Sequence, residues 1–208
     1  FIGGEKVKAF EKEMAAHQGA EEVVSCGSGT DALFLTLKAL GIGSGDEVIT
    51  TPCTAIPTSE AITLAGGRVV FADIAPGTFH LDPSRVAEAV TPRTKAILPV
   101  HLYGAPCDLD ALCQIARDKG VQLVEDCAQA QGARWKGARV GTFGDAACFS
   151  FFPSKALGCF GDGGAMTAKD AAVRERQRMY ANHGRLAKFD HVVEGINSRL
   201  DALQAGVL

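Results

Sequence analysis

The segment from Gly27 to Ala32 places glycines, a serine and a threonine between a predicted strand and a predicted helix. Free backbone N–H groups at a helix N-terminus bind anions, and glycine lets a phosphate approach the backbone closely. The spacing Gly27-x-Gly29-x-x-Ala32 also matches a dinucleotide fingerprint, which requires an acidic residue at the end of the next strand. Asp46 and Glu47 precede the next predicted strand instead of ending it. This pattern favours a generic phosphate-binding turn over a dinucleotide site, with a purely structural turn as the third alternative.

Asp126 follows an apolar run at the carboxyl end of another predicted strand. A carboxylate at such a buried position is costly unless a cationic partner neutralises it, which indicates a functional partner. The alternative is that Asp126 caps the N-terminus of a following helix, a common position for aspartate. The sequence leaves both interpretations open.

Lys155 stands among apolar and glycine residues directly after a predicted strand. Burial lowers the pKa of a lysine and makes its amine a nucleophile that can form a Schiff base. The alternative is a loop lysine whose stem packs on the surface while its amine reaches water. A phosphate-binding turn, a carboxylate for a pyridinium nitrogen and a desolvated amine are together the groups that pyridoxal phosphate requires.

The elements that must position these residues follow from the alternation of short β-rich runs with amphipathic stretches, which predicts an α/β domain with a mainly parallel sheet. Ligands of such sheets bind at the carboxyl ends of the strands, where all three segments lie. The predicted strands are 22–26, 47–51, 68–72, 96–100, 121–125, 146–151 and 165–167. The predicted helices are 7–16, 31–40, 57–65, 83–90, 109–119 and 171–183, and helical spacing recurs in 199–208.

The composition excludes several classes of protein. With 47% hydrophobic and 22% charged residues, the chain is typical of soluble globular proteins and unlike disordered ones. A net charge of −3 without a block of like charge gives no support for nucleic-acid or membrane-surface binding. Seven scattered cysteines without a CxxC pair favour a reduced, cytoplasmic protein over a zinc or disulfide framework. The chain lacks an initiator methionine and stops within a helical pattern, so we expect a piece of a longer protein.

Several stretches form an ordered set. They are 1–7, 28–33, 45–49, 125–130, 144–151, 155–158, 161–165 and 195–205, and they include Glu125-Asp-Cys-Ala-Gln-Ala130 and Lys155-Ala-Leu-Gly158. This set resembles the sugar-nucleotide aminotransferases of the DegT/StrS type, which belong to the fold-type I class of pyridoxal-phosphate enzymes. The resemblance covers essentially the whole chain. It implies that residues 1–208 form a three-layer α/β/α large domain, trimmed at its front and without the C-terminal small domain.

The resemblance implies a role for each residue of the site. Lys155 would form a Schiff base with pyridoxal phosphate and later carry a proton to the substrate carbon. Asp126 would pair with the ring nitrogen. The other contacts would come from the backbone amides of Gly29, Thr30 and Asp31, the hydroxyl of Ser150, Gln129 one helical turn beyond Asp126, and Asn197, which would reach the phosphate of the partner subunit in a homodimer.

Ala55 departs from the family pattern. Thr51-Pro-Cys-Thr-Ala-Ile-Pro-Thr58 carries Ala55 where the family usually has an aromatic residue stacked on the cofactor ring. A methyl group supplies little of the contact area that an aromatic ring provides. This departure puts the cofactor affinity and the substrate subclass in question.

The resemblance implies transfer of an amino group from an amino acid, with glutamate expected as donor, to a keto-sugar nucleotide. The alternatives are dehydration or aromatisation within the same family, and a regulatory protein that binds the cofactor without turnover. Deoxysugar dehydratases of the family carry histidine in place of the lysine, so Lys155 argues against that branch. No metal, nucleic acid or membrane partner is expected, and the sequence does not specify the sugar, its carbon or the nucleotide.

Other polar residues invite functional interpretation. His101 and Tyr103 follow a predicted strand, where structural hydrogen bonding is favoured over a role in a substrate pocket. His183 and Arg185 follow a predicted helix, and capping of its end or contact with substrate are the two alternatives. The cysteines are expected to be small core residues.

Overall fold

The structure is a computed structural model that describes residues 2–208; Phe1, which opens the first family-like stretch, lies outside the described residues. The helices are α1 (Glu5–Gln18), α2 (Gly29–Ala39), α3 (Pro57–Leu64), α4 (Pro83–Ala89), α5 (Leu109–Lys119), α6 (Ala171–Ala181) and α7 (Ala202–Val207), with a 3₁₀ turn η1 (Leu102–Gly104). The strands are β1 (Val24–Cys26), β2 (Glu47–Thr50), β3 (Arg68–Phe71), β4 (Thr94–Leu98), β5 (Gln122–Asp126), β6 (Arg134–Trp135), β7 (Ala138–Arg139), β8 (Ala146–Ser150), β9 (Gly164–Ala168), β10 (Arg185–Ala187) and β11 (Asp190–His191).

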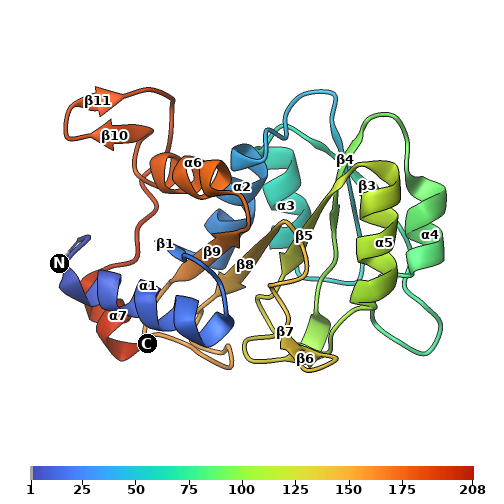
Figure 1. The fold of residues 1–208 in the computed structure, drawn as a ribbon, viewed down its shortest axis with the longest axis horizontal. Helices are drawn as coiled ribbons and strands as arrows, with labels where there is room; N and C mark the ends of the chain where they lie inside the picture. Colours follow the sequence, from blue (N-terminus) through green and yellow to red (C-terminus); the bar gives the residue numbers. More distant parts are fainter. Residues whose placement is uncertain (1) are drawn as a thin grey trace.

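A seven-stranded sheet in the order β1-β9-β8-β5-β4-β2-β3 forms the centre of the molecule (Figure 1). Strand β9 is antiparallel to both of its neighbours, and the pairs from β8 to β3 are parallel. Strands β1, β8, β5, β4, β2 and β3 therefore all end at the same edge of the sheet. The predicted α/β fold with a mostly parallel central sheet is confirmed.

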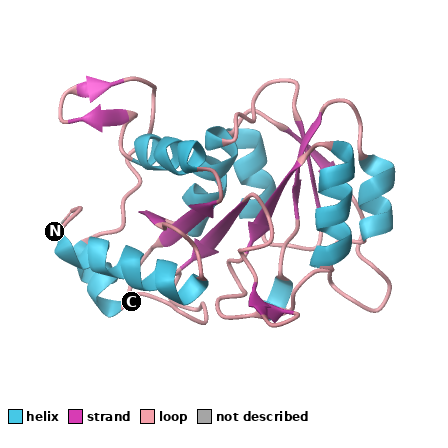
Figure 2. Cartoon of the chain, viewed as in Figure 1, coloured by secondary structure: helices cyan, strands magenta, loops and turns pink. Residues whose placement is uncertain are grey.

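Helices cover both faces of this sheet, which gives the three-layer α/β/α arrangement (Figure 2). Side chains of α1, α4, α5 and α7 pack into one apolar cluster, and those of α2, α3 and α6 pack into another. Successive strand residues supply the two clusters in turn, as Leu123 and Val124 do on β5, because neighbouring side chains of a strand point to opposite faces. The first and last helices, α1 and α7, lie side by side (Figure 1).

The chain after α6 differs from its prediction. The helix ends at Ala181 and not at His183, because Asn182 is the C-cap and His183 has a positive φ of 58°. Gly184 follows with φ 73°, and a Cβ there would lie 1.6 Å from the carbonyl oxygen of Val193. This tight turn opens the hairpin β10–β11, which the sequence did not predict and which stands apart from the sheet (Figure 2).

Smaller differences concern the ends of elements. Strand β9 is longer at both ends than the predicted 165–167, and α1 extends the predicted 7–16 to Glu5 and Gln18. Within residues 2–208, the structure contains no helix that is both long enough and apolar enough to cross a membrane.

Candidate functional site

A cavity of about 210 Å³ lies at the edge of the sheet where the parallel strands end. Its wall combines the turn after β1, the start of α3, the end of β5 and the loop between β8 and β9. Most of the predicted site residues line it: Gly29, Thr30, Ala55, Asp126, Gln129, Ser150 and Lys155. Asp31 and Asn197 are the predicted site residues that do not line it.

The turn after β1 presents backbone N–H groups to this cavity. Ser28 is the N-cap of α2, and its Oγ accepts the N–H of Asp31 at 3.0 Å. The first amides of a helix lack partners within the helix, so the amides of Gly29 and Thr30 are left for a ligand. A Cβ on Gly29 would lie 2.5 Å from the Cβ of Ser150, so only glycine allows this close packing of the turn against β8. The geometry suits an anion such as phosphate.

Asp126 ends β5 with its carboxyl group buried, at 3% exposure. Thr58 Oγ1 donates to its Oδ2 at 3.0 Å, and the N–H of Ala128 donates to its Oδ1 at 3.0 Å. No helix starts at Asp126, and residues 127–130 directly after it form turns and irregular chain. The N-cap interpretation of Asp126 is therefore wrong, and so is the expectation that Gln129 lies one helical turn further along.

Burial raises the pKa of Asp126 above its ordinary value. The hydrogen bonds from Ala128 and Thr58 and the nearby charge of Lys155 oppose this rise without cancelling it. The carboxyl group is thus held in a place that lacks a sufficient cation. A positively charged group bound in the cavity would relieve this deficiency.

Thr58, to which no sequence motif assigns a role, holds Asp126 in place. It lies in the first turn of α3, is 1% exposed, and also contacts Thr54 Oγ1 through its Oγ1 at 2.9 Å. Because the one hydroxyl hydrogen of Thr58 goes to Asp126, Thr54 must be the donor of the second bond. The position of Thr58 at the start of the predicted helix 57–65, after the predicted strand 47–51, was the available sequence signal.

Lys155 and Gln129 occupy loops beside Asp126. Lys155 is half-buried in the loop after β8, where its backbone N–H donates to the carbonyl of Phe152 at 2.8 Å. Gln129 Oε1 accepts the N–H of Tyr103 at 2.8 Å, which ties the Gln129 loop to η1. Lys155 and Asp126 both line one cavity, as a ligand with an aldehyde and a basic ring nitrogen would require.

The acidic residues that the dinucleotide alternative needs lie at the opposite edge of the sheet. Glu47 begins β2 and accepts hydrogen bonds from Thr91 Oγ1 at 2.7 Å and Arg93 Nε at 2.7 Å, and it forms an ion pair with Arg68. The Oδ2 of Asp46 accepts the N–H of Gly43. Neither residue lines the cavity, so the geometry does not support the dinucleotide alternative.

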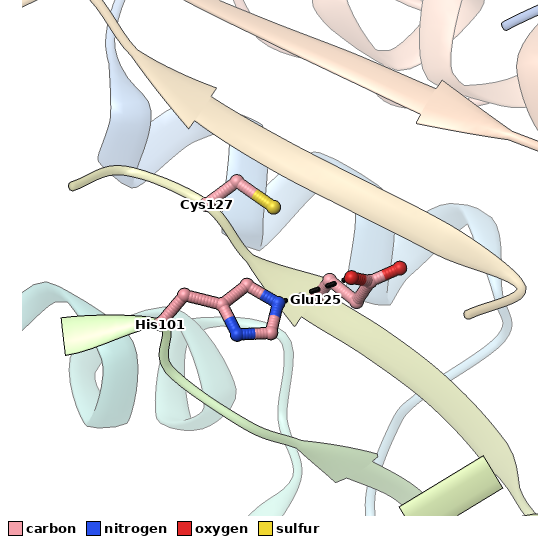
Figure 3. Close-up of side chains that lie close together, drawn as sticks. All are labelled: His101, Glu125 and Cys127. Atoms are coloured by element: carbon pink, nitrogen blue, oxygen red, sulfur yellow. Dashed lines mark hydrogen bonds and ion pairs between the residues drawn. The ribbon is translucent and has the colours of Figure 1, made fainter. Parts of the chain in front are cut away.

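The buried side chains of His101 and Glu125 are hydrogen-bonded to each other, and the thiol of Cys127 lies near both (Figure 3). His101 Nδ1 accepts the N–H of Cys107 at 3.1 Å, so in the neutral ring Nε2 carries the hydrogen and donates to Glu125 Oε2 at 3.0 Å. This confirms the preferred interpretation of His101 as a structural residue. Tyr103, by contrast, is 74% exposed.

Glu125 organises the other side of this cluster. Its Oε2 also accepts the N–H of Gly141 at 2.7 Å, and its Oε1 accepts those of Phe143 and Gly144, each at 2.8 Å. All four acceptor positions of the carboxylate are therefore used. Burial raises the pKa of Cys127 well above its ordinary value, which keeps it a thiol. Glu125 therefore fixes the backbone of residues 141–144, just before β8, by hydrogen bonds.

The remaining predictions fall outside the cavity. The backbone N–H of His183 donates to Ile196 and its carbonyl faces His191 Nδ1, so this residue serves the turn after α6. Five cysteines are buried and two are partly buried, all with free thiols; they are Cys26, Cys107, Cys127, Cys148 and Cys159, and Cys53 and Cys113.

Comparison with known proteins gives a consistent result. A family profile described as the DegT/DnrJ/EryC1/StrS aminotransferase family matches residues 1–208. A UDP-2-acetamido-2-deoxy-3-oxo-D-glucuronate aminotransferase of Pseudomonas aeruginosa is 47% identical over 208 residues, which are 100% of this chain and 58% of that protein. A protein named pleiotropic regulatory protein from Geobacillus stearothermophilus is 48% identical over 208 residues, 100% of this chain and 56% of that protein.

The solved structures agree with the sequences. The X-ray structure of Streptomyces venezuelae DesV in complex with a ketimine intermediate superposes with a TM-score of 0.97 at 47% identity. The match covers 99% of this chain and 56% of that one. The chain therefore spans a little over half the length of the relatives that it matches.

Proposed function

The chain belongs to the DegT/DnrJ/EryC1/StrS aminotransferase family, and from this premise we propose that the protein is a pyridoxal-phosphate-dependent aminotransferase that acts on a keto-sugar nucleotide. The observation that carries the proposal is the joint presence of Lys155, Asp126 and the turn at Gly29 and Thr30 in one cavity. Residues 1–208 are the large, cofactor-binding domain in this proposal.

The residues of the cavity fit pyridoxal phosphate. The free amides of the turn after β1 suit its phosphate, and Ser150 lies close enough to the turn to add a hydroxyl. The buried carboxyl group of Asp126, whose pKa is raised by burial, suits a cationic ring nitrogen. Lys155 supplies the amine. The amide of Asp31 already donates to Ser28, so its direct contact with the phosphate stays a prediction, as does that of Asn197, whose side chain is exposed.

Each residue has a defined task in the proposed reaction. The cofactor, when bound, supplies a carbonyl that combines with amines and a ring that takes up an electron pair. Nζ of Lys155 would hold the cofactor and would move the proton at the substrate carbon. Asp126 orients the ring through its nitrogen and keeps that nitrogen charged, while Thr58 and Ala128 fix the two carboxylate oxygens. Gln129 lines the cavity with Asp126 and would lie against the ring or its 3′-oxygen.

The substrates and partners of the proposal follow the relatives. The acceptor is a keto sugar linked to a nucleotide, the class to which the named substrate of the Pseudomonas aeruginosa relative belongs. The donor is an amino acid, with glutamate as the first candidate. The protein acts as a homodimer in which Asn197 reaches the partner's site. Its seven free cysteines support a reducing, cytoplasmic setting.

A regulatory protein that binds the cofactor without turnover is the second candidate, because the Geobacillus stearothermophilus relative is named a regulatory protein. Single-turnover spectroscopy on the intact, cofactor-loaded protein separates the two. The aminotransferase predicts that L-glutamate converts the visible absorbance of bound pyridoxal phosphate to that of pyridoxamine phosphate, and that a keto-sugar nucleotide reverses the change. A chromophore that no amino acid alters would reject turnover and support the regulatory alternative.

A further inference from the structure

Ser198 connects the proposed phosphate turn to a segment far away in the sequence. The N–H of Gly27 donates to Ser198 Oγ at 2.9 Å, and Ser198 Oγ donates to Asp31 Oδ2 at 2.7 Å. The serine side chain thus receives one hydrogen bond from the turn and returns its only hydrogen to the first turn of α2. Ser198 is 1% exposed, so water does not replace these partners.

The segment 196–198 that carries this serine is itself firmly attached. The N–H of Ile196 donates to the carbonyl of Tyr180 at 2.8 Å, and the N–H of Ser198 donates to that of Ala181 at 2.9 Å. Both acceptors lie in the last turn of α6. A Cβ on Gly27 would lie 3.2 Å from Ser198 Oγ, which shows how closely the turn packs on this segment.

The orientation of Asp31 gives the contact its importance. Asp31 is an acidic residue in the first turn of α2, next to amides that attract anions. Its carboxylate accepts the Ser198 hydrogen and lies outside the cavity lining. A carboxylate without this donor would turn to the nearest free N–H groups, as aspartate does at helix starts. It would then occupy the anion site and repel a phosphate.

We propose that Ser198 is a positioning residue for the phosphate turn: its hydroxyl holds the Asp31 carboxylate away from the amides of Gly29 and Thr30 and keeps them free for the cofactor phosphate. This inference rests on the proposed function. It predicts that loss of the Ser198 hydroxyl weakens the binding of a ligand that carries a phosphate and leaves the binding of the same ligand without a phosphate unchanged.

The test compares the dissociation constants of pyridoxal phosphate and pyridoxal, measured by absorbance titration of the intact protein stripped of cofactor. Both ligands can react with Lys155, and only the first has a phosphate. For Ser198→Ala we expect pyridoxal phosphate to bind about tenfold more weakly, the effect of losing a hydrogen bond to a charged group. Pyridoxal should bind within about twofold of its wild-type value, since this bond serves the phosphate alone.

Ser25→Ala is the matched control. Ser25 is 8% exposed and lies on β1 just before the turn, where its Oγ donates to Glu11 Oε1 at 2.7 Å. Its loss removes the same kind of bond without releasing Asp31, so the ratio of the two constants should stay at its wild-type value. Ser198→Cys, which keeps the shape but donates poorly, should give an intermediate ratio and carries the test if the alanine variant does not fold.

An unchanged ratio in the Ser198 variants would overturn the inference, and so would an equal change in the Ser25 and Ser198 variants. A wild-type protein that binds neither pyridoxal phosphate nor pyridoxal would instead reject the proposed function. The two failures are therefore distinguishable in the same titrations.

Discussion

Two buried carboxyl groups stand at opposite edges of the sheet and have opposite environments. Glu47 begins β2 and has 0% exposure, and hydrogen bonds from Thr91 and Arg68 lower its pKa to about 2. Asp126 ends β5 with 3% exposure, and burial raises its pKa. Both accept hydrogen bonds, but only Glu47 is hydrogen-bonded to cationic side chains among residues 2–208.

This difference teaches how the fold separates stability from function. At the edge where the parallel strands begin, Arg68 and Arg93 balance the charge of Glu47. This interaction stabilises the folded protein without a ligand. At the carboxyl edge, Asp126 receives neutral donors alone and faces a cavity. A buried carboxyl group without adequate compensation is costly, and such a cost is understandable where a ligand supplies the missing charge.

The largest expected effect concerns Lys155 at the carboxyl edge. Lys155→Ala should reduce the single-turnover reaction with an amino-acid donor by at least about a thousandfold, because it removes the group that moves the proton. The free energy of unfolding without cofactor should barely change, since Lys155 lies half-buried in a loop. Stopped-flow absorbance and urea unfolding give the two values. Lys136→Ala, at an exposed hairpin tip, is the control, and retention of turnover by Lys155→Ala would contradict the mechanism.

The next effect distinguishes function from stability at Asp126. Asp126→Asn should lower turnover by about a hundredfold, because the amide cannot keep a ring nitrogen charged. Without cofactor, the variant should be more stable than the wild type at pH 7. Because the pKa of Asp126 is higher in the folded state than in the unfolded state, the wild-type protein loses stability as the pH rises between these two pKa values. The stability difference between Asp126→Asn and the wild type should disappear at pH values below the ordinary pKa of aspartate. Urea unfolding between pH 3 and pH 8 measures these differences. An Asp126→Asn variant that is less stable than the wild type over this whole range would contradict the prediction.

Glu47→Gln makes the same chemical change at the other edge and should have the opposite effect. The pKa of Glu47 is lowered to about 2 from an ordinary value of 4.5, so its stabilisation is present above that ordinary value and is lost as the pH falls toward 2. The variant should be less stable than the wild type at pH 7, with the difference closing in acid. Its affinity for pyridoxal phosphate should stay within about twofold, as for a site remote from the ligand. A clear loss of cofactor affinity would remove the proposed separation of the two edges.

How far the sequence predicts these two edges depends on the range of the interactions. The strands of the central sheet and the helices that cover it were predictable because apolar periodicity is local, and α5 spans the predicted 109–119. The choice between a cap and a ligand partner for Asp126 was not, because the deciding donor is Thr58, 68 positions away. The role of Glu125 depends in the same way on amides of 141–144. Local patterns contain no information on such long-range bonds.

The polar end of α6 shows a second limit. The helical pattern continued to His183, but the bond from His183 N–H to the carbonyl of Ile196 redirects the chain into β10. The neighbouring residue Asn182 contacts the same segment, since it pairs with Asn197 in an isolated β-bridge. Helix propensity in the last turn is weak in comparison with tertiary bonds. The sequence therefore predicts the existence of α6 better than its end.

The smallest expected effect tests whether the carboxyl edge is incomplete in packing as well as in charge. Ala55 is exposed and lines the cavity, so an aromatic side chain there has room to lie against a bound ring. Ala55→Phe should strengthen pyridoxal phosphate binding about fivefold, the usual contribution of ring stacking. Ile56→Phe is the control, since Ile56 is 73% exposed and does not line the cavity. Equal affinities in titrations of all three proteins would mean that Ala55 is not the stacking position. Weaker binding by Ala55→Phe alone would mean that the small side chain leaves space the ligand itself requires.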